Sequence, residues 1–398
     1  MKRREFVAAS AAAALTPALA RGRARPSNPP QQAAPALTPA VYAERRARAQ
    51  VELERRGLDL LVATPGTNFQ YLTGGNPGRS ERLIALLLPK LGDPVIVAPG
   101  FEVERVRRIT TVADVRGWEE QDDPFALAAR VATQMARGGR VALEPSTEYG
   151  TSLRFAEAMP RHRIVNGGPV FEHLRIIKQA VELDLIRRAI GITQDAIAAT
   201  FAQLQVGMTE RDVSGIVSRE MTQRGGRGGG LVQFGPSAAL PHGSPQMRRL
   251  EQGQPVLMDC GSSVEGYTSD ITRTQWFGGE PPERFKTVYN TLHAAQTAAM
   301  SLGRPGVQCQ EMDRAARRVI RDAGFGEYFT HRIGHGMGME GHEAPYLVEG
   351  NTVQLEAGMV TTIEPGIYIP EVWGCRTEDD IVVTDAGVEV LSRRVTTI

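Results

Sequence analysis

The hydrophobic and polar positions follow two different periods along the first part of the chain. Short apolar runs predict strands at residues 58–63, 82–89, 94–99 and 140–144. Amphipathic stretches with a helical period predict helices at residues 41–56, 101–108, 125–137 and 152–159. This alternation indicates an α/β domain, which we place at residues 37–170. Its sequence holds no cluster of histidines, cysteines or carboxylates, so we expect it to support the chemistry of another domain.

A long amphipathic helix opens a second domain, placed at residues 171–398. Its apolar positions recur at helical steps: Ile186, Ile190, Ile197, Phe201 and Leu204. The downstream sequence then repeats, because VGMTERDV (206–213) matches PGVQCQEM (305–312) at an offset of 99 residues (305 minus 206). Each copy opens a helix that ends near a glycine. Two such units indicate a duplicated fold, with a site between its halves to which each half contributes ligands.

A glycine-rich stretch, GGRGGG (225–230), lies between the repeated motif and the strand LVQFG. It lacks the Lys-Ser/Thr pair and the following helix of a phosphate-binding loop. We therefore interpret it as a flexible turn.

Composition narrows the possible partners. The 398 residues are 41% hydrophobic and 23% charged, as in an ordinary globular protein. A formal net charge of +1 gives no basis for binding nucleic acid or an anionic membrane surface. Three cysteines are too few for a disulfide framework in a chain of this length. Partners must therefore be inferred from particular sites.

The first residues have the features of an export signal. Arg3 and Arg4 precede an apolar run at residues 7–15, and Ala18-Leu19-Ala20 is typical of a cleavage site. The arginine pair indicates the twin-arginine route. We expect a signal at residues 1–20, a Pro-rich linker at 21–36 and a mature protein in the periplasm. No other segment approaches the ~20 apolar residues of a membrane span, so we expect no membrane contact after cleavage.

Four carboxylates stand at the ends of apolar strand patterns. Asp259 closes VLM, and Asp270 follows on the next strand. Glu364 closes MVTTIE, and Glu378 opens IVV. Each of them alone could be a turn, capping or edge residue, although strands disfavour acidic side chains. Together with one imidazole of HRIGHGMGMEGHE (331–343), they indicate a cation site.

The expected ligands are rich in oxygen and include no thiolate. This favours Mn²⁺, Co²⁺ or Zn²⁺ in a catalytic site over a structural zinc site, with Mn²⁺ preferred among the three. Four carboxylates repel one another too strongly around one divalent ion. We therefore expect two ions that share bridging carboxylates, and such pairs hold and activate a hydroxide.

At these residues the chain resembles the pita-bread metallopeptidases, the family of creatinase, aminopeptidase P and prolidase (Xaa-Pro dipeptidase). YLTGG (71–75) and LRIIKQAVELDLIRRA (174–189) are typical of its proline-specific branch. The resemblance implies an α+β protein with a creatinase-like α/β N-terminal domain and a pseudo-two-fold pita-bread catalytic domain. It also implies a homodimer.

The resemblance assigns five metal ligands: Asp259, Asp270, His335, Glu364 and Glu378. Asp270 and Glu378 are the pair that it implies as bridging ligands. All five are present, so the chain does not match the metal-free relatives of the family.

The resemblance also assigns residues on the substrate side of the metals. His242, His331 and His342 match histidines that hydrogen-bond the scissile peptide and its tetrahedral intermediate. Arg376 lies two residues before Glu378, so both side chains face the same way on a strand. It is expected to hold a carboxylate and to reach the substrate.

The implied reaction is hydrolysis of Xaa-Pro bonds in short peptides by a hydroxide that bridges the metals. Glu364 would carry the proton to the leaving nitrogen. The proline nitrogen carries no N–H, and a site that holds the carbonyl oxygen tolerates this loss. Chain length favours a prolidase-like enzyme. The alternatives are an aminopeptidase P that acts on longer Xaa-Pro peptides, or a lyase or binding protein of the same fold.

Three residues depart from the family pattern. Cys260 follows Asp259 and Cys375 precedes Arg376, and strand alternation turns both sulfurs away from the metals. Their strands are expected to be close, but export after folding in a reducing cytoplasm favours buried free thiols over a disulfide. Gly341 stands where a β-branched residue is usual, and it is expected to loosen His342.

Overall fold

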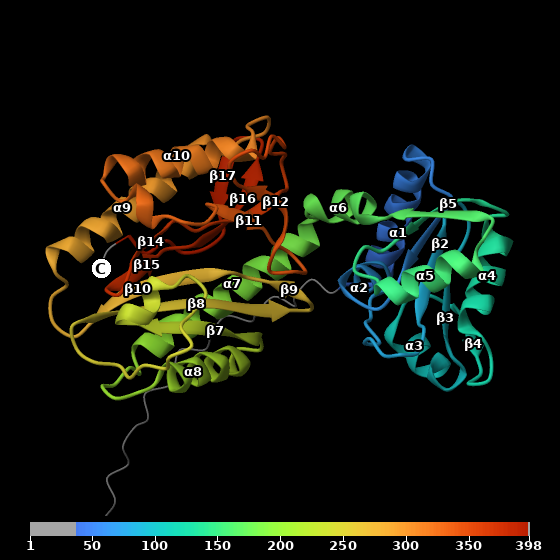
Figure 1. Cartoon of the computed structure of the whole chain (residues 1–398), viewed down its shortest axis with the longest axis horizontal. Coiled ribbons are helices and arrows are strands. Elements are labelled where there is room, and N and C mark those ends of the chain that lie inside the picture. The colour runs from blue at the N-terminus through green and yellow to red at the C-terminus, as the bar shows by residue number, and fades with distance from the viewer. Residues whose placement is uncertain (1–36, 397–398) are drawn as a thin grey trace, which may run out of the picture. The chain divides into compact units, whose positions relative to one another are not determined.

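The computed structural model describes residues 37–396, so the expected export signal and linker lie outside the described residues. Helices and strands alternate in an N-terminal domain, and helix pairs precede antiparallel sheets in a C-terminal domain (Figure 1). This confirms the α+β class with two domains. The boundary between residues 170 and 171 remains a prediction. Among the described residues no helix is long and apolar enough to cross a membrane.

The N-terminal domain is built on one six-stranded sheet, ordered β4-β3-β2-β1-β5-β6. Its strands are β1 (Leu60–Ala63), β2 (Ala85–Pro89), β3 (Val95–Pro99), β4 (Asp114–Trp118), β5 (Gly139–Leu143) and β6 (His162–Asn166). Its helices are α1 (Pro39–Arg55), α2 (Thr67–Thr73), α3 (Val103–Ile109), α4 (Pro124–Met135), α5 (Tyr149–Ala158) and α6 (Gly168–Ile176), with the 3₁₀ turn η1 (Gly100–Glu102) before α3.

The predicted elements of this domain are present, but its two edge strands were not predicted. β4 and β6 are only partly buried and carry charged residues such as Asp114 and Arg163. An edge strand packs on fewer neighbours than a central one, so it lacks the continuous apolar run of β1 to β3. The hydrophobic pattern therefore detected only the fully buried strands and β5.

The C-terminal domain contains two helix pairs, each followed by a sheet. The first pair is α7 (Ala180–Phe201) and α8 (Glu210–Gln223), and the second is α9 (Glu283–Leu302) and α10 (Cys309–Asp322). The first sheet has the order β10-β8-β7, with β7 (Arg227–Phe234), β8 (Gln254–Val264), β10 (Ile271–Phe277) and the short β9 (Tyr267–Thr268) beside β8. A 3₁₀ turn, η2 (Gly235–Ala239), follows β7.

The second helix pair is followed by η3 (Gly326–Tyr328) and a five-stranded sheet, ordered β12-β11-β13-β16-β17. Its strands are β11 (Gly334–Gly336), β12 (Glu343–Leu347), β13 (Val360–Ile363), β16 (Asp379–Thr384) and β17 (Gly387–Val390). A separate hairpin joins β14 (Gly366–Ile369) to β15 (Trp373–Arg376). Figure 1 shows these sheets between α9 and α10 on one side and α7 and α8 on the other.

The two halves of this domain repeat each other in detail, as the sequence echo predicts. Helices α8 and α10 have 14 residues each, and both are followed by a glycine with positive φ, Gly225 at 83° and Gly324 at 85°. The residue before each of these helices forms an isolated antiparallel bridge, Thr209 with Arg249 and Gln308 with Gln354. A site between the halves can therefore receive ligands from equivalent positions.

From Arg227 onward the glycine-rich stretch is a strand and not a flexible turn, which corrects our prediction. Residues 227–234 form β7 and pair with β8 along their whole length. A Cβ at Gly228 would lie 2.0 Å from the carbonyl oxygen of Gly261, and one at Gly230 would lie 2.2 Å from the Cys260 sulfur. The glycines therefore let two backbones approach closely. This requirement of the tertiary structure produces the same glycine-rich composition as a turn.

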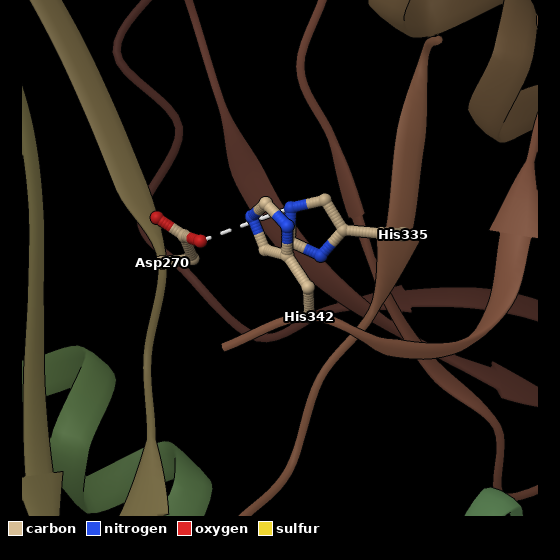
Figure 2. A group of neighbouring side chains, drawn as sticks. All are labelled: Asp270, His335 and His342. Carbon is tan, nitrogen blue, oxygen red and sulfur yellow. Dashed lines mark ion pairs between the residues drawn. The ribbon is translucent and has the colours of Figure 1, made fainter. Parts of the chain in front are cut away.

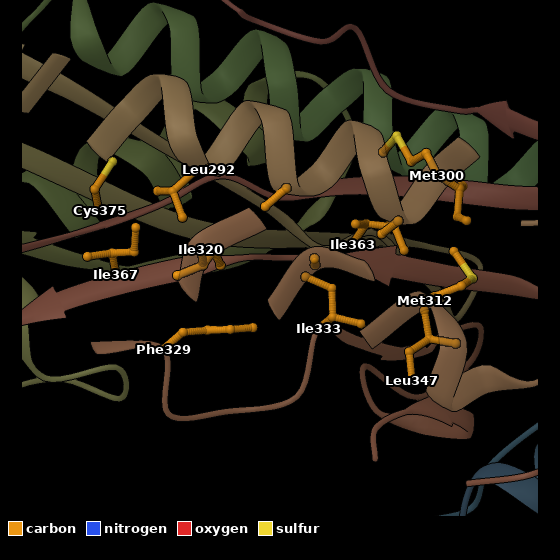
Figure 3. Close-up of a cluster of buried hydrophobic side chains, with 14 of the residues drawn as sticks. Leu292, Met300, Met312, Ile320, Phe329, Ile333, Leu347, Ile363, Ile367 and Cys375 are labelled. Carbon is orange, nitrogen blue, oxygen red and sulfur yellow. The ribbon is translucent and has the colours of Figure 1, made fainter. Parts of the chain in front are cut away.

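The core of the second half packs α9 and α10 against the strands that carry the later site residues (Figure 3). Cys309 and Cys375 belong to this cluster, whereas Cys260 belongs to a separate cluster around α7 and β8. All three are free, buried thiols, as we expected. The expected proximity of Cys260 and Cys375 is not reflected in their packing, because each lies in the core of its own half.

Candidate metal centre

The first half of the domain contributes two carboxylates from adjacent strands. Asp259 lies within β8, and Asp270 lies directly before β10, which pairs with β8. The backbone N–H of Asp270 donates to the carboxylate of Asp380 at 3.1 Å. Asp259 accepts a hydrogen bond from the Arg376 guanidinium at 2.6 Å. Both aspartates are therefore oriented by residues of the second half.

The second half contributes one imidazole and two carboxylates. His335 is buried within β11, and its Nδ1 lies 3.1 Å from the carbonyl oxygen of Gly336. A proton on Nδ1 would donate to that carbonyl and leave the Nε2 lone pair free. Nε2 lies 3.3 Å from a Glu364 oxygen and 3.8 Å from an Asp270 oxygen. His335 is therefore oriented as a ligand between carboxylates of the two halves.

Glu378, directly before β16, is the most deeply held carboxylate of the site. It is 2% exposed, and the Thr272 hydroxyl donates to it at 2.6 Å. Its backbone N–H donates to the carbonyl oxygen of Thr272 at 3.1 Å, which joins the second half to β10. These two bonds fix Glu378 at the seam between the halves.

The potential ligand atoms form compact groups that fit the two-ion prediction. His335, Glu364 and Glu378 offer atoms within 4.8 Å of one another, and so do Asp259, Asp270 and Glu378. These two triplets contain all five predicted ligands and share Glu378. A third group joins Asp270, His335 and His342, which Figure 2 shows with both rings beside the carboxylate.

The mutual repulsion of the buried carboxylates also favours bound cations at this site. Burial, followed by repulsion from nearby carboxylates and above all Asp259, raises the pKa of Asp270 well above its ordinary value. Burial and repulsion from Asp270 raise the pKa of Glu378 in the same way. Burial also acts to raise the pKa of Glu364, but the hydrogen bond and charge of His335 outweigh it and leave this pKa lowered. A divalent cation removes the repulsion, so the donor set fits metal ions.

A hydrogen-bonded chain runs from Arg376 through Tyr368 to His331. Arg376 donates to the Tyr368 hydroxyl at 2.8 Å, and that hydroxyl lies 2.8 Å from Nε2 of His331. The other ring nitrogen of His331 lies 2.7 Å from the carbonyl oxygen of Arg332. Burial lowers the pKa of His331 and raises that of Tyr368 to about 12, so both side chains are neutral near pH 7. Both nitrogens of His331 are therefore already engaged.

His342 has a different hydrogen-bonding arrangement. The Arg332 guanidinium lies 3.2 Å from Nδ1 of His342, so this nitrogen accepts and the neutral ring carries its proton on Nε2. Burial, and then the charges of His335 and Arg332, lower the pKa of His342. The ring lies beside that of His335, with 3.9 Å between centroids. His342 therefore presents an N–H donor next to the predicted ligand His335, which suits a contact with a substrate oxygen.

A cavity of about 530 Å³ brings the predicted residues together. Four of the five predicted ligands line it, as do all of the predicted substrate-side residues, with His335 buried beside it. The lining residues are Pro241, His242, Asp259, Asp270, His331, Arg332, His342, Val348, Glu364, Arg376 and Glu378. The structure thus groups every predicted residue, while their individual roles remain predictions.

Sequence reasoning missed three residues that hold the site together. Tyr368 links Arg376 to His331, Thr272 binds Glu378, and Asp380 binds the backbone of Asp270. The signal for Asp380 was present, because it follows Glu378 by two residues in a buried strand. Tyr368 and Thr272 carry no such signal, since a tyrosine or threonine in an apolar strand is ordinary.

Two family models match this chain. The model described as metallopeptidase family M24 matches residues 184–385, and that of the creatinase/prolidase N-terminal domain matches residues 45–177. The chain belongs to metallopeptidase family M24, and its two-domain fold is the pita-bread architecture expected from the sequence.

Relatives and solved structures agree with this assignment. An uncharacterized peptidase of Staphylococcus aureus is 37% identical over 347 residues, which are 86% of this chain and 96% of the relative. The structure is similar to dipeptidase PepE from Mycobacterium ulcerans, with a TM-score of 0.85, 38% identity and coverage of 92% of this chain and 99% of that one. It is also similar to a prolidase from Thermococcus sibiricus, with a TM-score of 0.83, 31% identity and coverage of 89% and 97%.

Proposed function

We propose that this peptidase hydrolyses Xaa-Pro bonds of short peptides with two divalent metal ions, as a prolidase-like enzyme. The observation that carries the proposal is the pair of ligand triplets that share Glu378 inside a cavity lined by three histidines and Arg376. The dipeptidase and prolidase among the similar structures support a short Xaa-Pro substrate.

The ligand set suits Mn²⁺, with Co²⁺ and Zn²⁺ as alternatives, because it combines four carboxylates with one imidazole. When bound, such a pair of ions would lower the pKa of a water molecule to provide a hydroxide nucleophile and would polarise the scissile carbonyl. The protein supplies the remaining functions.

Glu364 is suited to carry a proton from the nucleophile to the leaving nitrogen. Its pKa is lowered, so it begins as a carboxylate that can accept a proton. The Nε2–H of His342 is suited to donate to the oxyanion of the tetrahedral intermediate. Arg376 keeps Asp259 oriented and, through Tyr368, holds His331 against the cavity wall.

The proposed substrate explains why the site relies on donors to the carbonyl oxygen. The nitrogen of an Xaa-Pro bond has no N–H, so a protease that binds this hydrogen loses a contact. His242 and His342 reach the cavity from separate loops and can hold the carbonyl side of the bond. An aminopeptidase P that acts on longer Xaa-Pro peptides is the alternative.

The proposal is tested by loading the protein with Mn²⁺ and measuring metal content and hydrolysis together. We expect about two ions per chain, cleavage of an Xaa-Pro dipeptide and no cleavage of a proline-free control peptide. Asp270→Ala should lose activity and metal while the far-ultraviolet circular dichroism stays unchanged. Full activity with one ion per chain, or equal cleavage of the control peptide, would contradict the proposal.

We also propose that the mature protein is a periplasmic homodimer. The support for export is the twin-arginine signal pattern of residues 1–20, and the support for a dimer is the family resemblance. Fractionation of cells that express the chain with Arg3→Lys and Arg4→Lys tests the route. If the unchanged chain and the variant were found in the same compartment, export by the twin-arginine route would be contradicted.

A further inference from the structure

A second cavity adjoins the metal centre and shares a wall with it. It has a volume of about 320 Å³, and His342 lines both this cavity and the metal-site cavity. The other lining residues are Asn68, Pro145 and residues of α6, all from the N-terminal domain, and residues around the start of β12. Nothing in the proposed chemistry uses this space.

Much of the cavity wall is fixed by buried ion pairs. Arg175 pairs with Glu343, and Lys178 donates to the same carboxylate at 2.8 Å. Arg175 also donates to the Asn68 side-chain oxygen at 2.9 Å. Glu343 is 9% exposed at its side chain and its pKa is lowered, because the charges of Lys178 and Arg175 outweigh the effect of burial. The Glu343 carboxylate next to His342 is therefore paired with two cations.

Acidic groups outnumber basic groups in the lining. Glu172, Glu340 and Glu343 line the cavity together with a single cation, Arg175. Arg175 and the adjoining Lys178 supply two positive charges against these three carboxylates, so one negative charge (3 minus 2) remains. Glu340 lies 3.5 Å from Arg175 but keeps 47% of its side chain exposed. The cavity therefore favours a cationic side chain over an anionic one.

The second cavity is within reach of a peptide bound at the metal centre. The His342 ring is in contact with the ring of the ligand His335, at 3.9 Å between centroids. An extended peptide advances about 3.3–3.6 Å per residue. A chain that leaves the metal centre past His342 therefore enters the second cavity within about two residues of the scissile bond.

We infer that this second cavity is a subsite for the third residue of an Xaa-Pro-Xaa peptide, with a preference for lysine or arginine. The inference rests on the proposed function, because cleavage after the first residue leaves only the carboxyl side of the substrate free to extend. The enzyme then accepts tripeptides, and its discrimination among them depends on Glu172 and Glu340.

The test compares kcat/KM for Ala-Pro-Lys and Ala-Pro-Glu on the Mn²⁺-loaded enzyme, with Ala-Pro-Ala as reference and Ala-Pro as the dipeptide. Exposed ion pairs of this kind give up to about a fivefold preference for Lys over Glu each. The preference should shrink toward one at high salt, since salt screens exposed charges.

Two variants address the acidic groups, and one serves as a matched control. Glu340→Gln should lower the Lys-to-Glu ratio, and Glu172→Arg should lower it further or invert it. Glu356 is exposed and lines neither cavity, so Glu356→Gln should keep the wild-type ratio. Each ratio is taken within one variant, so a general loss of activity does not affect it.

The outcomes separate the inference from the proposed function. If no Xaa-Pro peptide is hydrolysed, the proposed function fails and the inference fails with it. If Ala-Pro is hydrolysed but the tripeptides are not, or Lys and Glu are treated alike, only the inference is overturned. A Lys preference that survives both substitutions also overturns it, because another part of the protein then recognises the third residue.

Discussion

At the scale of single residues, the hydrogen-bond partner of each imidazole decides what that imidazole can do. His335 directs one nitrogen to a carbonyl and the other to carboxylates, which suits a metal ligand. His342 accepts from Arg332, so its remaining nitrogen carries a proton and donates. His331 has both nitrogens engaged within the protein. Three histidines within twelve residues thus have three different arrangements.

His342→Ala should lower kcat by about 10²–10³ while metal content stays near that of the wild type. The reason is that the lost Nε2–H donor acts on charge that develops in the transition state. The measurement combines steady-state kinetics with elemental analysis of the purified variant. Loss of the ions would instead identify His342 as a ligand, as the Asp270, His335 and His342 group permits.

At the scale of elements, helix α10 holds the segment that enters β11. Asp313, fully buried on α10, accepts from the backbone N–H of Ile333 at 2.9 Å. Arg317, one turn later, donates to the carbonyl oxygens of Phe329 at 3.1 Å and His331 at 2.5 Å. Arg317 also pairs with Asp313 at 2.6 Å. One helix face thus sets the position of His331 and the entry to the ligand strand.

Arg317→Met should lower kcat by about tenfold or more and leave KM and metal content nearly unchanged. The reason is that a small misplacement of a site residue weakens the stabilisation of the transition state. Arg317→Lys should recover part of the rate, since it keeps the charge next to Asp313. The neighbouring Arg318 is exposed, so Arg318→Met is the control. Equal kinetics for Arg317→Met and Arg318→Met would show that this helix does not position the site.

Helix α9 contributes a buried histidine that makes stability depend on pH. His293 is 8% exposed, and burial, with repulsion from Arg394, lowers its pKa to about 4. In the unfolded chain the pKa is about 6.5. Between about pH 6.5 and pH 4, His293 is therefore protonated in the unfolded chain but neutral in the folded protein. The free energy of unfolding should fall as the pH drops from about 6.5 to about 4, by up to ~1.4 kcal/mol per pH unit.

The contribution of His293 is measured by comparison with His293→Leu. Guanidinium unfolding of both proteins at pH 7 and pH 5 gives the difference in stability at each pH. The wild type should lose more stability than the variant on going to pH 5, because the variant has no proton to bind. If the wild type and His293→Leu differ in free energy of unfolding by the same amount at pH 7 and at pH 5, the pKa of His293 is not lowered as its burial requires.

At the scale of the whole molecule, Arg45 joins the N-terminal domain to the C-terminal domain. It lies on α1 and is completely buried. Its guanidinium pairs with Glu182 on α7 at 3.2 Å, and donates to the Tyr267 hydroxyl on β9 at 2.6 Å. It also lies over the Tyr71 ring, 4.2 Å from its centroid. Both domains thus share one buried charge network.

Arg45→Met should destabilise the protein by about 3–5 kcal/mol, because it leaves the charge of the buried Glu182 without its cation. Calorimetry should then resolve two unfolding transitions, one for each domain. The double variant Arg45→Met with Glu182→Leu should recover much of the loss, since the unpaired charge is gone. Arg108 is exposed, so Arg108→Met should change stability by no more than about 0.5 kcal/mol. A single unshifted transition for Arg45→Met would contradict a role in coupling the domains.

The sequence by itself determined the features that depend on local periodicity and on residue chemistry. The buried strands β1 to β3 and the helices α1, α3, α4, α5 and α7 follow from hydrophobic spacing, and the repeat of α8 in α10 follows from a matching sequence motif. Four carboxylates beside apolar strands, together with one imidazole, indicate a cation site, and the family resemblance assigns the five predicted ligands. Each of these signals can be seen in a short segment of sequence, so no knowledge of distant contacts is needed to detect it.

Only the tertiary structure decided the features that depend on contacts between distant segments. The glycines of β7 were misread as a turn because their purpose is the close approach of β8. Tyr368 and Asp313 gain importance from partners far away in sequence or in another element. The second cavity forms between α6 and the segment that follows β11, some 165 residues apart (340 minus 175). The local sequence does not indicate these contacts between distant segments, because packing brings the two surfaces together only once the chain has folded.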